Sequence, residues 1–99
     1  MYKSIILPLA KEDILEAAQW YNKQQNGLGK RFTAEVREKV HFIRQNPEAI
    51  NVIYNDIRTA VLNLFPYMLH FTIDEENKTI IILAVLHTSR NPALWKKRS

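Results

Sequence analysis

The sequence contains no cysteine, which excludes a disulfide scaffold, a thiolate metal site and a cysteine nucleophile. It has only two glycines, Gly27 and Gly29, so it has no glycine-rich loop of the kind that cradles phosphate. The apolar run from Ser4 to Leu7 is too short for a signal peptide, and no stretch is long enough to span a membrane. These absences predict a cytoplasmic protein that does not associate with membranes.

Length and composition favour one globular domain, spanning residues 1–99, in which 46% of the residues are hydrophobic and 24% are charged. A domain this small buries a low fraction of its surface, so apolar surface left outside the core is expected to bind a partner. The net charge of +4 fits an acidic protein or a nucleic acid as partner, or simply a need for solubility.

The first half of the sequence predicts a strand and two helices. Residues Ser4 to Leu7 form a short apolar run that Pro8 ends, which is typical of a strand. Two segments with helical spacing follow, separated at Gly27 and ended by Asn46-Pro47. Their apolar positions are Ala10, Ile14, Ala17, Ala18 and Tyr21 in the first, and Phe32, Val36, Val40 and Ile43 in the second. The short link between them predicts an antiparallel helix hairpin.

The second half predicts a loop at residues 47–56 and then three strands, at residues 57–64, 67–74 and 79–87. Short links at Phe65-Pro66 and at residues 75–78 make these strands an antiparallel meander. The last strand is apolar at both parities, so it is predicted to be central, with the first strand beside it.

The expected register assigns residues to the two faces of the sheet, because side chains alternate along a strand. With two-residue turns at Phe65-Pro66 and Glu76-Asn77, one face, which includes Ala84 and Leu86, is almost wholly apolar and requires the helix hairpin as its cover. No element remains to cover the other face. That face collects Thr59, Val61, Asn63, Met68, His70, Thr72, Ile81, Leu83, Val85 and His87. Its apolar members form a larger patch than solvent exposure favours, so it is predicted to bind another chain.

The candidates for acid–base or phosphate chemistry are His70, His87 and Arg90. In the expected register the two histidines lie about 13 Å apart, which argues against joint action. Together with His41 they show no metal-ligand spacing, so neither a metal nor a cofactor is expected. The aromatic pair Trp20 and Tyr21 is interpreted as helix packing rather than a base-stacking platform.

Motifs in a fixed order run through nearly the whole chain: Ala17-Ala18-Gln19-Trp20-Tyr21, Gly27-Leu28-Gly29-Lys30-Arg31-Phe32, Phe65-Pro66-Tyr67, Leu83-Ala84-Val85-Leu86-His87, Arg90-Asn91-Pro92 and Trp95. Together they resemble the RelE/ParE superfamily of toxins from type II toxin–antitoxin systems, and its ParE-like branch in particular. The resemblance implies an α+β fold of β-α-α-β-β-β order, with the helix hairpin on one face of a four-stranded, mostly antiparallel sheet. It also implies a toxin that arrests growth, as in plasmid stabilisation, and an antitoxin whose C-terminal segment wraps and neutralises it.

The target differs between branches, since RelE-like members cleave mRNA on the ribosome and ParE-like members act on DNA gyrase. RelE-like nucleases carry an arginine directly after a tyrosine on the third strand and a tyrosine or histidine near the C-terminus. Here Met68 follows Tyr67 in place of that arginine, and Trp95 stands near the C-terminus in place of the tyrosine or histidine. Arg90 matches an arginine that the RelE-like nucleases carry near the C-terminus. RelE-like nucleases also use basic side chains on the sheet, and Arg58 could replace one of their strand lysines. Its place in the alternation directs it toward the helices, however, unless a bulge intervenes. Met68 cannot deprotonate a 2′-hydroxyl, stabilise a phosphorane or protonate a leaving oxygen, so the nuclease set is incomplete.

These observations favour a ParE-like toxin that inhibits gyrase without catalysis. One alternative is a ribosome-dependent mRNA endonuclease using His70, His87 and Arg90, and another is an inactive binding module with the same fold. The surface predicted to bind the antitoxin comprises Val61, Met68, His70, Leu83, Val85, His87, Arg90 and Trp95.

Overall fold

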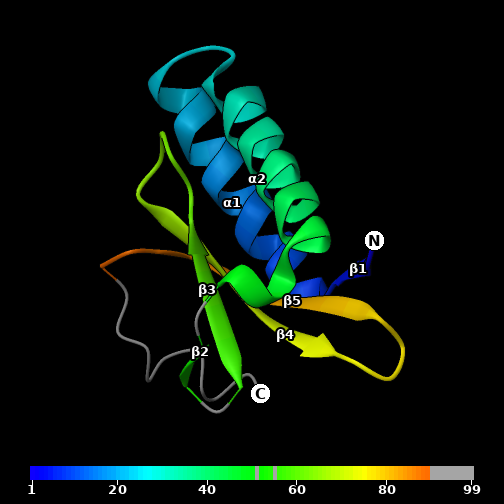
Figure 1. Cartoon of the computed structure of the whole chain (residues 1–99). Coiled ribbons are helices and arrows are strands. Elements are labelled where there is room, and N and C mark those ends of the chain that lie inside the picture. The colour runs from blue at the N-terminus through cyan, green and yellow to red at the C-terminus, as the bar shows by residue number, and fades with distance from the viewer. Residues whose placement is uncertain (51, 55, 90–99) are drawn as a thin grey trace.

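The computed structural model of the chain describes residues 1–50, 52–54 and 56–89. Strand β1 (Lys3–Ile6) leads into helices α1 (Pro8–Gln24) and α2 (Leu28–Gln45), and strands β3 (Ile57–Val61), β4 (Tyr67–Asp74) and β5 (Thr79–His87) follow. Both helices lie side by side on one face of the sheet (Figure 1). The predicted α+β fold, with its helix hairpin and its order of elements, is confirmed.

Two short elements lie within residues 47–56, where a loop was predicted. They are the 3-10 turn η1 (Pro47–Ala49) and the strand β2 (Val52–Tyr54), which pairs antiparallel with β3. β2 therefore adds an edge strand to the four that were predicted, and the full order is β1-β5-β4-β3-β2. Three residues with a shifted register are too few for an alternating pattern to reveal a strand.

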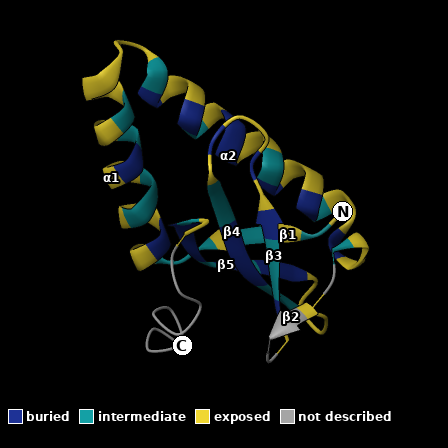
Figure 2. Ribbon diagram, turned by 90° about the vertical axis from the view of Figure 1, so that its left-hand side faces the viewer, coloured by how far each residue is buried: buried dark blue, intermediate teal, exposed yellow. Residues whose placement is uncertain are grey.

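The core lies between the sheet and the helix layer. β5 pairs parallel with β1 and antiparallel with β4, so it lies beside the first strand, as predicted. The middle strand of the five is β4 rather than β5, because β2 adds an edge on the far side. Leu69, Phe71 and Ile82 of the sheet are fully buried against Phe32 and Ile43 of α2. The buried sides of both helices face this layer and their exposed sides face away from it (Figure 2), which is the arrangement expected of amphipathic helices.

The two glycines determine how the helices meet. Gly27 adopts φ 90° immediately before α2, and its backbone N–H donates to the side-chain oxygen of Asn22 at 2.9 Å. Gly29, in the first turn of α2, lies so close to α1 that an added Cβ would stand 2.5 Å from the carbonyl oxygen of Ala18. The hairpin therefore turns at one glycine and packs closely at the other.

An aromatic cluster joins the hairpin to the β3–β4 link. The ring of Tyr21 stacks on Phe32 and meets Phe65 edge-on, with centroid distances of 5.5 and 4.7 Å. Burial, together with the neighbouring Tyr67, raises the pKa of the Tyr21 hydroxyl above its ordinary value. The interpretation of Tyr21 as a packing residue is confirmed, whereas Trp20 contacts it edge-on but remains 56% exposed.

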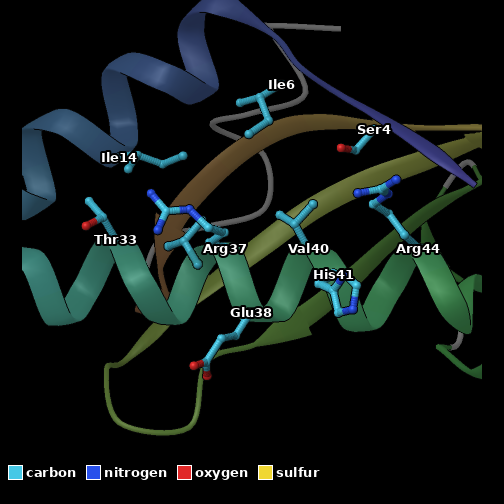
Figure 3. Close-up of a pocket in the computed structure, with 10 residues that line it drawn as sticks. Ser4, Ile6, Ile14, Thr33, Arg37, Glu38, Val40, His41 and Arg44 are labelled. Carbon is cyan, nitrogen blue, oxygen red and sulfur yellow. The ribbon is translucent and has the colours of Figure 1, made fainter.

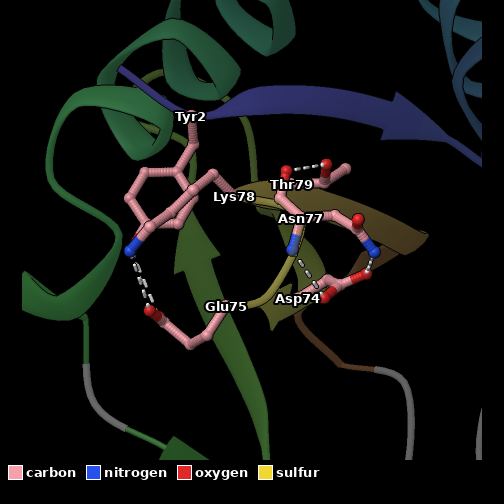
Figure 4. A network of polar contacts seen from close by, with 6 residues as sticks. All are labelled: Tyr2, Asp74, Glu75, Asn77, Lys78 and Thr79. Atoms are coloured by element: carbon pink, nitrogen blue, oxygen red, sulfur yellow. Dashed lines mark hydrogen bonds and ion pairs between the residues drawn. The ribbon is translucent and has the colours of Figure 1, made fainter.

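The turn between β4 and β5 holds the start of β1 in place. The hydroxyl of Tyr2 donates to the Glu75 carboxylate at 3.1 Å, and Lys78 Nζ lies 3.5 Å from the same group (Figure 4). Within the turn, the side chain and backbone of Asn77 donate to Asp74, and these bonds lower the pKa of its carboxyl group. The N-terminal end of β1 is thus fixed at one edge of the sheet.

A candidate protein-binding face of the sheet

The link between β3 and β4 is longer than predicted. Val61 lies opposite Met68 and Arg58 lies opposite Phe71, so residues 62–66 connect the strands in place of a two-residue turn. The register is therefore displaced by two residues. Because side chains alternate with a period of two, this displacement leaves the predicted faces of β3 and β4 unchanged.

Strand β5 contains a bulge at Leu83 that the sequence did not reveal. Phe71 pairs with Ile82 while the preceding residue, His70, pairs with Ala84, so Leu83 is the extra residue in β5. Side chains beyond a bulge are reversed relative to an uninterrupted strand. Helix α1 supports this part of β5, since the carboxylate of Asp13 accepts a hydrogen bond of 3.0 Å from the backbone N–H of Val85.

Val85 and His87 do not lie on the face predicted for them. Val85 is 1% exposed and belongs to the core beneath the helices. His87 lies opposite Tyr67, and the two rings meet edge-on at 5.3 Å between centroids. The predicted face is wrong for both residues, because the alternation was extended through the bulge. Ala84 and Leu86, which were expected beneath the helices, take the opposite face instead.

The sheet face turned away from the helices is mostly apolar. We call it the outer face, and it includes Ile57, Thr59, Val61, Met68, His70, Thr72, Ile81, Leu83, Ala84 and Leu86 of β3, β4 and β5. Ile57, Ala84 and Leu86 form a buried cluster there, beside a Val61 that is 52% exposed. Neither α1 nor α2 covers this face (Figure 1).

Four of the predicted partner-binding residues meet on the outer face: Val61, Met68, His70 and Leu83. Val61 and Met68 lie directly opposite each other, and Met68 also faces Leu86 on the next strand. These three side chains form an apolar row across three strands. Arg90 and Trp95 lie outside the described residues.

The predicted catalytic candidates are not brought together. His70 lies on the outer face and His87 on the helix side, so the sheet separates their rings. Arg90, the third candidate, lies outside the described residues. Arg58 faces the helix side, where its guanidinium donates to the carbonyl oxygen of Ile50. No bulge turns Arg58 outward within β3 (Ile57–Val61).

His87 instead lines a small cleft of about 310 Å³ between α1 and the ends of β4 and β5. Glu16 and the exposed Trp20 line the same cleft.

The third histidine, His41, is exposed on α2 and hydrogen-bonds Gln45 at 3.1 Å. Within residues 1–50, 52–54 and 56–89, no group of three histidine, aspartate or glutamate side chains could hold a metal ion. None of the helices in the same ranges is long and apolar enough to cross a membrane.

Sequence reasoning missed Asp13, Ala84 and Leu86. The bulge that turns Ala84 and Leu86 to the outer face leaves no mark on a strand that is apolar at both parities, because either register then looks equally buried. Asp13 reads as one of several polar residues on an amphipathic helix, and its bonding partner is 72 positions away. The only usable signal was its place one residue before Ile14, at the margin of the apolar stripe.

Comparison with known proteins identifies the family and the fold. A family model described as ParE toxin of type II toxin–antitoxin system, parDE, matches residues 5–92. A search among proteins of curated function gives no match.

Several solved structures share the fold. A chain of the chromosomal ParDE system from P. aeruginosa is 18% identical, with a TM-score of 0.76 over 88% of this chain and 96% of that one. A chain of the intact E. coli RelBE complex is 17% identical, with a TM-score of 0.66 over 91% and 100%. A chain of a RelBE complex from Mycobacterium tuberculosis is 18% identical, with a TM-score of 0.61 over 87% and 96%. At these identities the likeness concerns the fold.

Proposed function

We infer that this chain, which belongs to the ParE toxin family of type II toxin–antitoxin systems, arrests growth by binding DNA gyrase and is neutralised by a cognate antitoxin. The family match extends from residue 5 to residue 92, so it includes both helices and all the strands that carry the outer face. The similar structures are named as toxin–antitoxin systems or complexes, which supports an antitoxin as the partner.

The choice of gyrase over mRNA is carried by the separation of the two histidines. RNA cleavage requires a base, an acid and a cation that converge on one phosphate. Here His70 and His87 lie on opposite sides of the sheet, and Arg58 is bonded to Ile50 beneath the helices. The thioether side chain of Met68 can act as neither an acid nor a base in proton transfer. A toxin that acts by binding fits these residues better than a nuclease.

Two assays on the purified chain test this proposal. We expect loss of DNA supercoiling when the chain is added to gyrase, and intact mRNA when it is added to translating ribosomes. Heat-denatured chain is the control for both assays. If mRNA is cut at defined codons while supercoiling is unaffected, the ribosome-dependent nuclease is the correct function. Inactivity in both assays would identify a binding module that retains only the fold.

The outer face is the surface we assign to the antitoxin. It is an apolar surface that neither α1 nor α2 covers, and it extends from the exposed Val61 through Met68 to Leu86. Burying such side chains against a partner releases about 25 cal/mol for each Å² of apolar area removed from water. Ile57, Ala84 and Leu86 are already buried, so an antitoxin segment laid across β3, β4 and β5 gains this free energy mainly at Val61 and Met68, without rearranging the core.

Replacing Val61 with lysine should separate neutralisation from toxicity. A lysine in the middle of an apolar contact must be desolvated, so we expect affinity for the antitoxin to fall by about tenfold or more. The measurement is titration of each variant against the purified cognate antitoxin. Leu15→Lys is the matched control, because Leu15 is 58% exposed on α1, in the other layer of the molecule. Equal losses for both variants would contradict the assignment of the outer face.

A further inference from the structure

The cleft between α1 and the ends of β4 and β5 is acidic, although the net charge of the chain is +4. Asp13 and Glu16 line it from α1, and no lysine or arginine lines it among the residues that the structure describes. We call it the acidic cleft. A larger hollow of about 770 Å³, lined by Ile14 of α1, differs in charge because Arg37 and Arg44 line it as well (Figure 3). The charge of the acidic cleft favours a cationic ligand.

Aromatic rings border the acidic cleft on both sides. Trp20 of α1 is 56% exposed, and its ring meets that of Tyr21 edge-on at 5.0 Å between centroids, so the packed Tyr21 supports the indole. Tyr67 and His87 line the cleft from β4 and β5, with their rings edge-on to each other. The face of an aromatic ring attracts a cation, and that of tryptophan does so most strongly.

The ring of His87 is bonded as a neutral imidazole. The backbone N–H of Ser89 donates to His87 Nδ1 at 3.1 Å, so Nδ1 is an acceptor and the proton of the ring is on Nε2. The hydroxyl oxygen of Ser89 also lies 2.7 Å from Nδ1. A neutral ring does not repel a cation, so His87 is compatible with one beside it.

The two carboxylates of the acidic cleft differ in their bonding. The Asp13 carboxylate accepts the hydrogen bond from the backbone N–H of Val85, which holds it against β5. Glu16 is exposed, and among the described residues it forms no ion pair. Because residues 13, 16 and 20 follow one another at spacings of three and four, they lie on one face of α1. Glu16 therefore lies beside Trp20, where it can accept hydrogen bonds from a donor stacked on the indole.

The volume of the acidic cleft fits a single side chain. It is about 310 Å³, at the lower end of the range of roughly 300–1,000 Å³ that ligand pockets occupy. A helix or a strand does not fit into this volume. A guanidinium group stacks on aromatic rings and donates two parallel N–H groups to a carboxylate, whereas the ammonium group of lysine is a compact and strongly hydrated charge. The combination of rings and carboxylates thus favours arginine.

Exposed apolar surface beside the acidic cleft indicates that the arginine belongs to a protein. Leu9 is 46% exposed, and it precedes Glu16 by two turns of α1, on the same face as Trp20. Arginine and tryptophan are enriched among the residues that dominate protein interfaces, where surrounding contacts exclude water. The phosphates of a nucleic acid would be repelled by the two carboxylates.

We propose that the acidic cleft receives an arginine side chain of the protein that the toxin inhibits. The cleft lies on the helix side of the sheet, and of the outer face only Leu86, which is 5% exposed, also lines it. The antitoxin assigned to the outer face and the target arginine therefore contact different side chains. The identity of the occupant as the target rests on the proposed function, whereas the chemistry of the cleft does not.

The first test uses N-acetyl-arginine amide as the probe, titrated into the ¹⁵N-labelled full chain and followed by NMR. We expect the indole N–H signal of Trp20 to shift, with a dissociation constant of about 1–10 mM. Trp95 is the other tryptophan, so the signal of Trp20 is assigned by its absence in Trp20→Leu. N-acetyl-citrulline amide, in which a neutral urea replaces the guanidinium, should not shift it.

Variants of α1 locate the binding. Glu16→Gln keeps the shape of the side chain and removes its charge, so we expect it to weaken binding of the arginine probe about threefold or more. Glu12→Gln is the matched control, because Glu12 is exposed on the same helix and does not line the acidic cleft. Equal shifts with the arginine and citrulline probes would overturn the proposal, as would equal affinity of Glu16→Gln and the wild type.

The second test asks whether the occupant is the target. Glu16→Gln and Trp20→Leu should raise the concentration needed to inhibit DNA supercoiling about tenfold, with affinity for the antitoxin unchanged. If instead they weaken only antitoxin binding, the arginine belongs to the antitoxin and the proposal is wrong. If Arg90→Gln strengthens binding of the arginine probe, an arginine of this chain competes for the cleft and the proposal is also wrong. A wild type that leaves gyrase active contradicts the proposed function, and the titration then still decides whether the acidic cleft binds arginine.

Discussion

Replacing Gly29 with alanine should lower the free energy of unfolding by about 2 kcal/mol. Inside a helix the same change usually stabilises a protein by about 0.5–1 kcal/mol, because alanine loses less backbone entropy on folding. At Gly29 the sign is reversed, since the new Cβ would lie 2.5 Å from the carbonyl oxygen of Ala18 and 3.2 Å from the Cβ of Asn22. The nearest atom belongs to the backbone of α1, so the helices must separate to relieve the contact. Urea unfolding monitored by circular dichroism measures the change.

Gly27 provides the matched comparison for this prediction. Its φ of 90° disfavours alanine, but a Cβ built there meets nothing within 4 Å. Asparagine tolerates the left-handed conformation, so Gly27→Asn should be milder than Gly27→Ala. At position 29 the order should be reversed, with asparagine worse than alanine because it is larger. If the two positions show the same dependence on side-chain size, close helix packing at Gly29 is not the cause.

Much of the fold was predictable because it rests on local patterns. The helical stripes ending at Gly27 and Pro47 predicted both helices, and the continuous apolar sequence of residues 79–87 predicted a strand between two neighbours. These signals record burial on one side or on both sides of an element. They do not depend on the distant residues that each element contacts.

The candidate site was less predictable, because it depends on one residue of register. The error in the β3–β4 link was harmless, since a displacement of two residues preserves the faces, and Val61 and Met68 were placed correctly. The bulge at Leu83 displaces β5 by one residue and reversed Val85 and His87. Asp13 lies on the adjoining helix and bonds the backbone just after the bulge, and only the three-dimensional structure brings the two together.

Glu35 was also invisible to the sequence analysis, although it connects α2 to the β3–β4 link. It is 8% exposed, and its carboxylate accepts hydrogen bonds from the backbone N–H of Asn63 at 2.5 Å and of Leu64 at 3.0 Å. Glutamate on a helix normally faces solvent, so its position beside the apolar stripe gave no indication of this role. The link that it holds contains Phe65 of the aromatic cluster and follows Val61 of the outer face.

Glu35→Ala should destabilise the chain by about 3 kcal/mol, since two backbone N–H groups lose a charged acceptor in a part-buried loop. Glu35→Gln retains one acceptor oxygen and should lose about half as much. Glu38→Ala, an exposed position on the same helix, should change stability by less than about 0.5 kcal/mol. Urea unfolding gives these differences, and hydrogen exchange at Asn63 and Leu64 locates them.

Accelerated exchange confined to the link in Glu35→Gln would show that the carboxylate holds the loop, and through it the edge of the outer face. Unchanged exchange there, with stability equal to that of Glu38→Ala, would show that the link folds without Glu35.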